Sequence, residues 1–133
     1  MSKSAGTKLD FLGYVFTGSG FPWGAATHLQ VNLHNSDPTP SGIASEFSSV
    51  YGGYAPVVVE RSGVSFIIGN PTVNAIDLLF PECTTGSDVI THVSISPVGF
   101  EQIIYYGTLG TPRIVTPGVK PEFKAGTLEI MEN

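Results

Sequence analysis

The fold class is decided by the stretch Thr27-His28-Leu29-Gln30-Val31-Asn32-Leu33-His34. Apolar Leu29, Val31 and Leu33 alternate with polar residues, so an extended segment here has one apolar and one polar face. The alternation does not match the helical period of about 3.6 residues. It predicts a half-buried antiparallel strand and therefore a β fold.

Further strand-like segments follow, separated by Gly, Pro and Asn turn formers. They cover residues 54–61, 65–68, 74–80, 88–96, 100–109, 113–116 and 127–131. About eight short strands with such turns predict an all-β fold, a jelly-roll-like antiparallel sandwich. A dense set of turn formers, including two prolines, predicts a long surface loop after the first strand.

A short helix is predicted before the first strand. Leu9, Leu12 and Phe16 lie close to one helical face, and Ser4 or Thr7 could cap the helix. A glycine-rich cluster at residues 17–20 would end it. We expect one β domain over residues 1–133, with residues 1–26 forming the helix and an arm that leads into the sandwich.

The composition favours a protein that works in an assembly. Charged residues make up 13% of the chain, about half of the roughly 25% found in soluble domains. The formal net charge of −5 and the six scattered Lys and Arg residues argue against nucleic-acid binding, which uses a basic stripe. No apolar run approaches the roughly 20 residues of a membrane span or the core of a signal peptide. Synthesis in the cytoplasm is the expectation.

Metal chemistry is the first alternative to a structural role. His28 and His34 lie six residues apart on one strand face, and Asp37 follows. At about 3.3 Å per residue their Cα atoms are roughly 20 Å apart, so they cannot share an ion within a straight strand. His92 could approach from another strand. A cupin-like metal-dependent enzyme therefore stays a third hypothesis, behind hydrogen-bonded sheet histidines.

Other catalytic patterns are weak. Cys83 is the single cysteine, so it has no intrachain disulfide partner, and its neighbours Glu82 and Thr84 supply no base that would stabilise a thiolate. The acidic residues could pair as glycosidase carboxylates, but any acidic domain offers as many candidates. There is no nucleophile elbow and no phosphate-binding glycine loop. We predict that the protein is not an enzyme and binds no cofactor or metal.

Aromatic side chains are the better candidates for contacts. Phe21, Trp23, Tyr51 and Tyr54 could anchor an interface or stack on a glycan, and the same residues could equally pack in the core. We also place Asp37 at the interface, in the loop after the first strand. Its alternative role is an Asx-type turn with the following proline, and the glycines between the two tyrosines could supply positive φ angles.

A series of motifs then points to a family. In chain order they are Leu33-His34-Asn35-Ser36-Asp37-Pro38, Glu46, Gly52-Gly53-Tyr54-Ala55, Phe80-Pro81, Thr91-His92-Val93, Tyr105-Tyr106-Gly107-Thr108-Leu109 and Ala125-Gly126-Thr127-Leu128-Glu129-Ile130. The series resembles a family of small structural proteins of tailed bacteriophages, described as head decoration or cement proteins and as tail-fibre-like proteins. The resemblance covers nearly the whole chain.

The resemblance implies a non-enzymatic role in the virion. We expect a capsid decoration or cement protein that stabilises the head by bridging capsid subunits. Its expected partners are the major capsid protein and copies of itself in a homotrimer, with contacts through the terminal segments and the loop at residues 35–49. The alternative is a tail or head fibre component that binds a host surface glycan through exposed tyrosines and the tryptophan.

Overall fold

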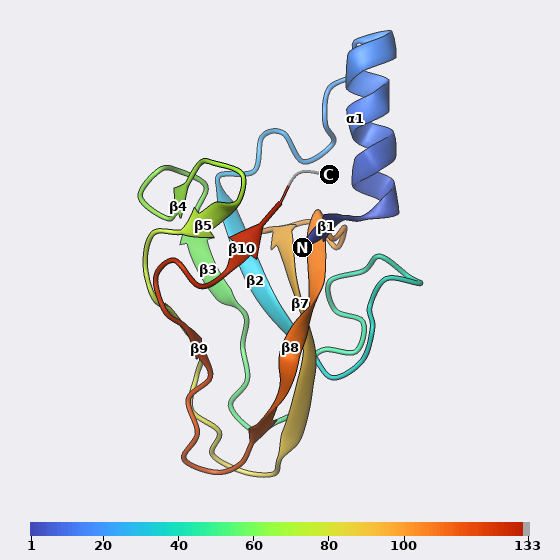
Figure 1. Cartoon of the computed structure of the whole chain (residues 1–133). Helices are drawn as coiled ribbons and strands as arrows, with labels where there is room; N and C mark the ends of the chain where they lie inside the picture. The colour runs from blue at the N-terminus through green and yellow to red at the C-terminus, as the bar shows by residue number, and fades with distance from the viewer. Residues whose placement is uncertain (132–133) are drawn as a thin grey trace.

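The computed structural model describes residues 1–131 (Figure 1). These residues form one α-helix, α1 (Ala5–Thr17), and ten strands. The strands are β1 (Ser2–Lys3), β2 (His28–His34), β3 (Val57–Glu60), β4 (Phe66–Ile67), β5 (Thr72–Asn74), β6 (Leu78–Leu79), β7 (Asp88–Pro97), β8 (Tyr105–Val115), β9 (Glu122–Phe123) and β10 (Glu129–Ile130). The predicted all-β fold with a short N-terminal helix is confirmed, with ten strands in place of about eight.

The largest sheet is antiparallel and has the strand order β1-β8-β7-β2-β3. β2, the stretch on which the fold prediction rests, lies between β7 and β3. Its residue His34 is paired with His92 of β7, and its residue His28 is paired with Glu60 of β3. β7 and β8 form the longest pair of neighbouring strands, and β1 adds two residues beside the start of β8.

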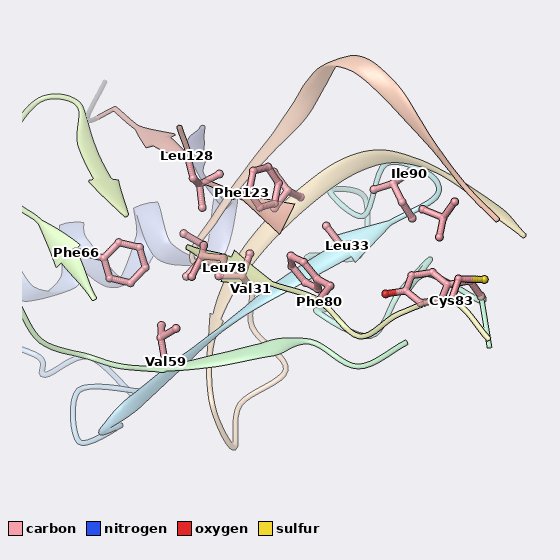
Figure 2. Close-up of a cluster of buried hydrophobic side chains, with 14 residues drawn as sticks. Val31, Leu33, Val59, Phe66, Leu78, Phe80, Cys83, Ile90, Phe123 and Leu128 are labelled. Atoms are coloured by element: carbon pink, nitrogen blue, oxygen red, sulfur yellow. The ribbon is translucent and has the colours of Figure 1, made fainter. Parts of the chain in front are cut away.

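Two smaller sheets supply the other side of the core. Their strand orders are β10-β5-β4 and β6-β9, and all their pairs are antiparallel. Figure 2 shows side chains of the large sheet packing against Phe66, Leu78 and Phe123 from the small sheets. The buried cluster comprises Val31, Leu33, Tyr51, Val59, Phe66, Leu78, Phe80, Cys83, Ile90, Val93, Ile95, Val115, Phe123 and Leu128.

The polar face of β2 is also covered, which the alternating pattern did not predict. Asn32 and His34 are buried together with Val31 and Leu33. The loop at residues 35–49 folds back over this face, and the backbone N–H of Ser49 donates to the Leu33 carbonyl. The second half of β2 is therefore buried on both faces, and its polar side chains need hydrogen-bond partners.

The strand predicted at residues 74–80 is wrong as a single element. It is divided between β5, which ends at Asn74, and β6. The fully buried Asn74 side chain explains the break, because its Nδ2 donates to the carbonyls of Ile76 and Lys124 while its Oδ1 accepts from the Leu128 N–H. Asn74 thus holds a turn and the C-terminal segment together.

The strands predicted at residues 100–109 and 113–116 merge into β8. Pro112 would interrupt a regular ladder here, because proline has no N–H to donate. The β7–β8 register instead shifts between Ile90 and His92, which pair with Arg113 and Thr108. Pro112 lies within this irregularity, where no ladder hydrogen bond is required, and β8 therefore continues past it.

Candidate functional site

α1 is well defined at both ends. The Ser4 hydroxyl oxygen accepts a hydrogen bond from the Thr7 N–H at 3.2 Å and so caps the first turn. At the other end, Gly18 has φ 72°, and its N–H donates to the Tyr14 carbonyl. The predicted helix is confirmed, and of the two candidate caps, Ser4 and Thr7, the structure has Ser4 at the N-cap.

One side of α1 is attached to the β body through polar groups. Thr7 is buried, and Gln102 Nε2 donates to Thr7 Oγ1 at 3.2 Å and to Asp10 Oδ2 at 2.8 Å. Gly6 faces the same glutamine, where an added Cβ would lie 3.2 Å from Nε2. The first half of the helix is therefore held close to the loop before β8.

The opposite side of α1 carries large apolar side chains that are largely exposed. Leu9 is 70% exposed and Phe16 is 78% exposed, and Leu12 between them is exposed as well. Figure 1 shows that the C-terminal half of α1 stands beyond the sheets. Their spacing in the sequence placed them on one helical face, and contacts were expected through the terminal segments, but these three residues were not among the predicted interface residues.

Two of the predicted interface residues lie beside α1. Phe21 stacks on Tyr14 of the helix with ring centroids 5.4 Å apart, and Trp23 follows Phe21 at 4.9 Å. Trp23 Nε1 also donates to Asp10 Oδ2, at 3.4 Å. The Arg61 guanidinium lies 5.5 Å from the Trp23 ring. Phe21 and Trp23 are partly exposed, so they remain predicted interface residues at the base of the helix.

Asp37 is exposed and forms the predicted Asx-type turn. Its Oδ1 accepts from the Thr39 N–H at 2.9 Å. Hydrogen bonds from the Thr39 side chain and backbone lower the pKa of Asp37 below its ordinary value of 3.8. The carboxylate therefore shapes the loop after β2, and its role in an interface stays a prediction.

Tyr51 and Tyr54 are not the exposed platform that glycan stacking would require. Tyr51 is only 3% exposed and its hydroxyl donates to the Pro81 carbonyl at 2.8 Å. Tyr54 packs against the core, and its hydroxyl oxygen accepts from the Leu33 N–H at 2.9 Å. The two rings meet edge to face with centroids 5.4 Å apart. Of the two roles that the sequence left open for these tyrosines, surface contact and core packing, the structure shows core packing, with Tyr51 buried and Tyr54 partly buried.

The glycines between these tyrosines are structural. The Gly52 N–H donates to the Thr85 carbonyl, and a side chain at Gly52 would overlap the Thr85 hydroxyl. Gly53 has φ 94°, a left-handed conformation that favours glycine. The Gly-Gly-Tyr motif therefore turns the chain and inserts Tyr54 into the core.

The histidines do not assemble a metal site. His34 is fully buried, and its cross-strand neighbour is His92, while His28 lies at the other end of β2. Burial lowers the pKa of His34 below its ordinary value of 6.5, an effect that its hydrogen bond to the Glu46 carbonyl opposes and that nearby His92 reinforces. No group of three or more His, Cys, Asp and Glu within residues 1–131 could hold a metal ion.

An apolar groove lies near Trp23, which the sequence analysis did not predict. Its volume is about 470 Å³, and its lining joins the large sheet to the β10-β5-β4 sheet. Leu29, Ile95 and Tyr105 supply one side, and Phe66 and Ile130 supply the other. These residues are far apart in sequence, so only the pairing of the sheets brings them together.

The fold and this surface define a small, β-rich protein with an exposed apolar helix. The chain matches the family described as Podophage GP4 fiber I protein gp80 over residues 2–131, and it belongs to that family. No curated protein matches it. The family confirms the expected role as a structural component of a phage particle. α1 is too short to cross a bilayer, and the described residues contain no other helix that could.

Proposed function

We propose that this protein is a fibre subunit of a phage particle and that α1 attaches it to the assembly. One observation carries the proposal, namely the large apolar side chains that α1 turns away from the body, with Leu9 and Phe16 the most exposed. The description of the family as a fibre protein supports the same role. The lack of an enzymatic activity stays a prediction.

The energetics of α1 favour a bound state. Fully burying a Leu or Phe side chain contributes about 1.5–3 kcal/mol. Leu9, Leu12 and Phe16 are neighbours on one helical face, so a single partner surface can bury all three. Contiguous exposed apolar surface of this kind marks protein interaction sites. The polar contacts of Gln102 hold the helix ready for such a partner.

Incorporation into particles tests the role of α1. We would supply phage lacking this protein with a Leu9→Glu/Phe16→Glu variant and quantify the chain in purified particles by mass spectrometry. The expected result is a folded variant that is absent from particles, because two buried carboxylates would oppose docking. The Ile114→Glu control removes an equally exposed apolar residue, 70% exposed, from β8. It should be incorporated normally, and normal incorporation of the α1 variant would contradict the proposal.

A capsid cement protein is the second candidate. It is favoured by exposed apolar residues on separate parts of the surface, because a cement protein must contact more than one neighbour. Val50, in the connection between β2 and β3, and Ile68, directly after β4, are both strongly exposed. Copies of the major capsid protein would then be the partners.

Two measurements separate the candidates. Electron microscopy of particles with and without the chain should show its density in a projecting fibre if the first candidate is correct. Density over the junctions of capsid subunits, together with a gain in heat resistance when purified protein is added back, would favour cement. The glycan hypothesis loses its predicted tyrosine platform, because Tyr51 is buried in the core and Tyr54 is partly buried against it.

A further inference from the structure

The apolar groove near Trp23 has the size and lining of a small-molecule site. Its volume of about 470 Å³ lies in the range of roughly 300–1,000 Å³ for ligand sites, which are mostly apolar with a few placed polar groups. Phe66 and Ile95 belong to its buried wall, with 8% and 2% of their surface exposed. Ile68 also lines the groove and is 86% exposed. The groove thus offers a formed apolar wall and an apolar side chain that a ligand can cover.

One guanidinium group supplies the charge of this groove. Arg61 is the only charged residue among the described residues that line it. Its Nη1 donates to the carbonyls of Gly24 at 2.9 Å and Ala26 at 3.0 Å, and its Cζ lies 5.5 Å from the centroid of the Trp23 ring. These contacts hold the guanidinium in place, so little further side-chain freedom is lost when it binds an anion.

The remaining donors of Arg61 suit a carboxylate. Both hydrogen bonds of the guanidinium within residues 1–131 come from Nη1, so Nε and Nη2 keep N–H groups for a ligand. Parallel N–H groups of this kind match the two oxygens of a carboxylate. Ser62 is the next residue and also lines the groove. Its Oγ accepts from the Val64 N–H at 3.3 Å, so its own proton can be donated to the same carboxylate.

The side of the groove formed by the β10-β5-β4 sheet suits a hydrocarbon chain. Phe66 and Ile130 are apolar, and the Thr72 Oγ1 already donates to the Gly69 carbonyl at 2.8 Å and accepts from the Gly69 N–H at 3.2 Å. A glycan or an extended peptide carries polar groups along its whole length, and burying them here without partners would cost free energy. A ligand with one polar end and an apolar chain avoids this cost.

We propose that this groove binds an unbranched fatty acid, with the hydrocarbon chain between the large sheet and the β10-β5-β4 sheet and the carboxylate on Arg61 and Ser62. The inference goes beyond attachment through α1 and does not depend on it. The groove is nevertheless linked to the helix, because the Trp23 Nε1 donates to Asp10 of α1. A bound chain would therefore pack against the residue that joins the segment before β2 to the helix.

Calorimetric titration of the purified protein with decanoate tests the ligand class. We expect saturable binding of one decanoate per chain. Decyltrimethylammonium has the same hydrocarbon chain and the opposite charge, so it should bind at least about tenfold more weakly beside Arg61. Acetyl-isoleucyl-isoleucine, an apolar carboxylate with a peptide backbone, should also bind more weakly than decanoate. No binding of decanoate, equal binding of the two hydrocarbon chains, or tighter binding of the peptide would each overturn the inference.

Two neighbouring isoleucines locate the site. Ile68 lines the groove, whereas Ile67, 58% exposed in β4, is not among its lining residues. Ile68→Glu places a carboxylate in the groove and should weaken decanoate binding at least about tenfold through repulsion and lost apolar contact. Ile67→Glu makes the same change outside the groove and should bind decanoate as wild type does. Unchanged binding by Ile68→Glu, or an equal loss in both variants, would overturn the placement.

Two further variants separate the groove from the exposed side of α1. Leu9→Glu/Phe16→Glu removes the most exposed apolar side chains of the helix and should bind decanoate as wild type does. Arg61→Lys keeps the positive charge but lacks the planar fork, so it should bind decanoate more weakly. Loss of binding in the α1 variant would place the hydrocarbon chain on the helix and overturn the inference. Unchanged affinity in Arg61→Lys would overturn the bidentate contact to the carboxylate.

Discussion

His34 and Ser94 lie on neighbouring strands with 2.7 Å between Nε2 of the imidazole and the serine Oγ. His34 Nδ1 is 2.8 Å from the Glu46 carbonyl oxygen, which can only accept, so Nδ1 carries the proton and Nε2 accepts from the Ser94 hydroxyl. Ser94 Oγ in turn accepts from Asn32 Nδ2 at 3.2 Å. This network gives the buried polar side chains on this face of β2 their hydrogen-bond partners while His34 stays neutral.

The neutral state of His34 predicts acid sensitivity. The pKa of His34 is lower in the folded protein than its ordinary value of 6.5, so the unfolded chain binds the proton first as the pH falls. Stability should therefore be complete above pH 6.5 and decline below it, by at most about 1.4 kcal/mol per pH unit for one proton. Urea unfolding of wild type and His34→Gln across this range measures the effect. The decline of the free energy of unfolding with falling pH should disappear in His34→Gln and persist in His28→Gln, which changes an exposed histidine. If wild type and His34→Gln show the same pH dependence, His34 is not the group responsible.

Alkaline pH should destabilise the protein through Tyr51. Burial raises the pKa of Tyr51 from 10.0 to about 12, with smaller contributions from Tyr54 and Cys83. The folded state therefore disfavours the phenolate, and the stabilisation present below pH 10 should be lost as the pH rises toward 12. Absorbance titration of wild type against Tyr51→Phe should reveal the late-titrating tyrosine. If the two titration curves differ only by one tyrosine that titrates at the ordinary pKa of 10.0, the burial of Tyr51 is contradicted.

Gly52 and Gly63 offer a matched pair of substitutions. Gly52→Ala places a Cβ against the Thr85 hydroxyl and should reduce the free energy of unfolding by about 1–3 kcal/mol. Gly63→Ala meets no atom within 4 Å and should be neutral or slightly stabilising. Thr85→Ala should recover part of the loss in the Gly52→Ala background. Equal stability of the two single variants, measured by thermal unfolding, would show that Gly52 is not close-packed.

Gln102 should control how firmly α1 is attached. Its amide donates to Thr7 and to Asp10, so Gln102→Leu removes both bonds and leaves buried Thr7 with one fewer partner. If the free energy that holds α1 in its attached state falls by about 1.4 kcal/mol, the population of the open state rises tenfold. Hydrogen exchange should therefore accelerate in α1 and stay unchanged in β2 and β7. Gln30→Leu, which removes a hydrogen bond to Asn32, serves as the control. If hydrogen exchange in α1 is unchanged in Gln102→Leu, Gln102 is not the residue that holds α1 to the body.

Much of the architecture could be predicted because it depends on local pattern. The alternation of Leu29, Val31 and Leu33 predicted β2, which is confirmed. The helix cap is Ser4, one of the two candidates that the sequence offered. Strand boundaries were less accurate where a single side chain overrides propensity. Asn74 divides a predicted strand through long-range hydrogen bonds, and Pro112 is tolerated inside β8 by a register shift in its partner.

The candidate site was predictable in part. The spacing of Leu9, Leu12 and Phe16 placed them on one helical face, and Phe21 and Trp23 were proposed as contact residues. Which face of α1 meets the body depends on Gln102, a residue more than ninety positions away in sequence. Tyr51 and Tyr54 were equally suited to surface contacts by residue type. In the structure Tyr51 is buried and Tyr54 is partly buried, and their hydroxyls bond to the backbone of Pro81 and Leu33, which are distant in sequence.

By itself the sequence determined the fold class, the helix, and the motifs that place the chain in a phage structural family, because period, capping and turn chemistry act over a few residues. Only the tertiary structure decided which apolar residues are core and which are exposed. That choice depends on contacts between distant segments: the loop at residues 35–49 buries His34, while Leu9 and Phe16 stay largely exposed among the described residues 1–131. The same kind of residue therefore stabilises the fold in β2 and remains available to a partner in α1.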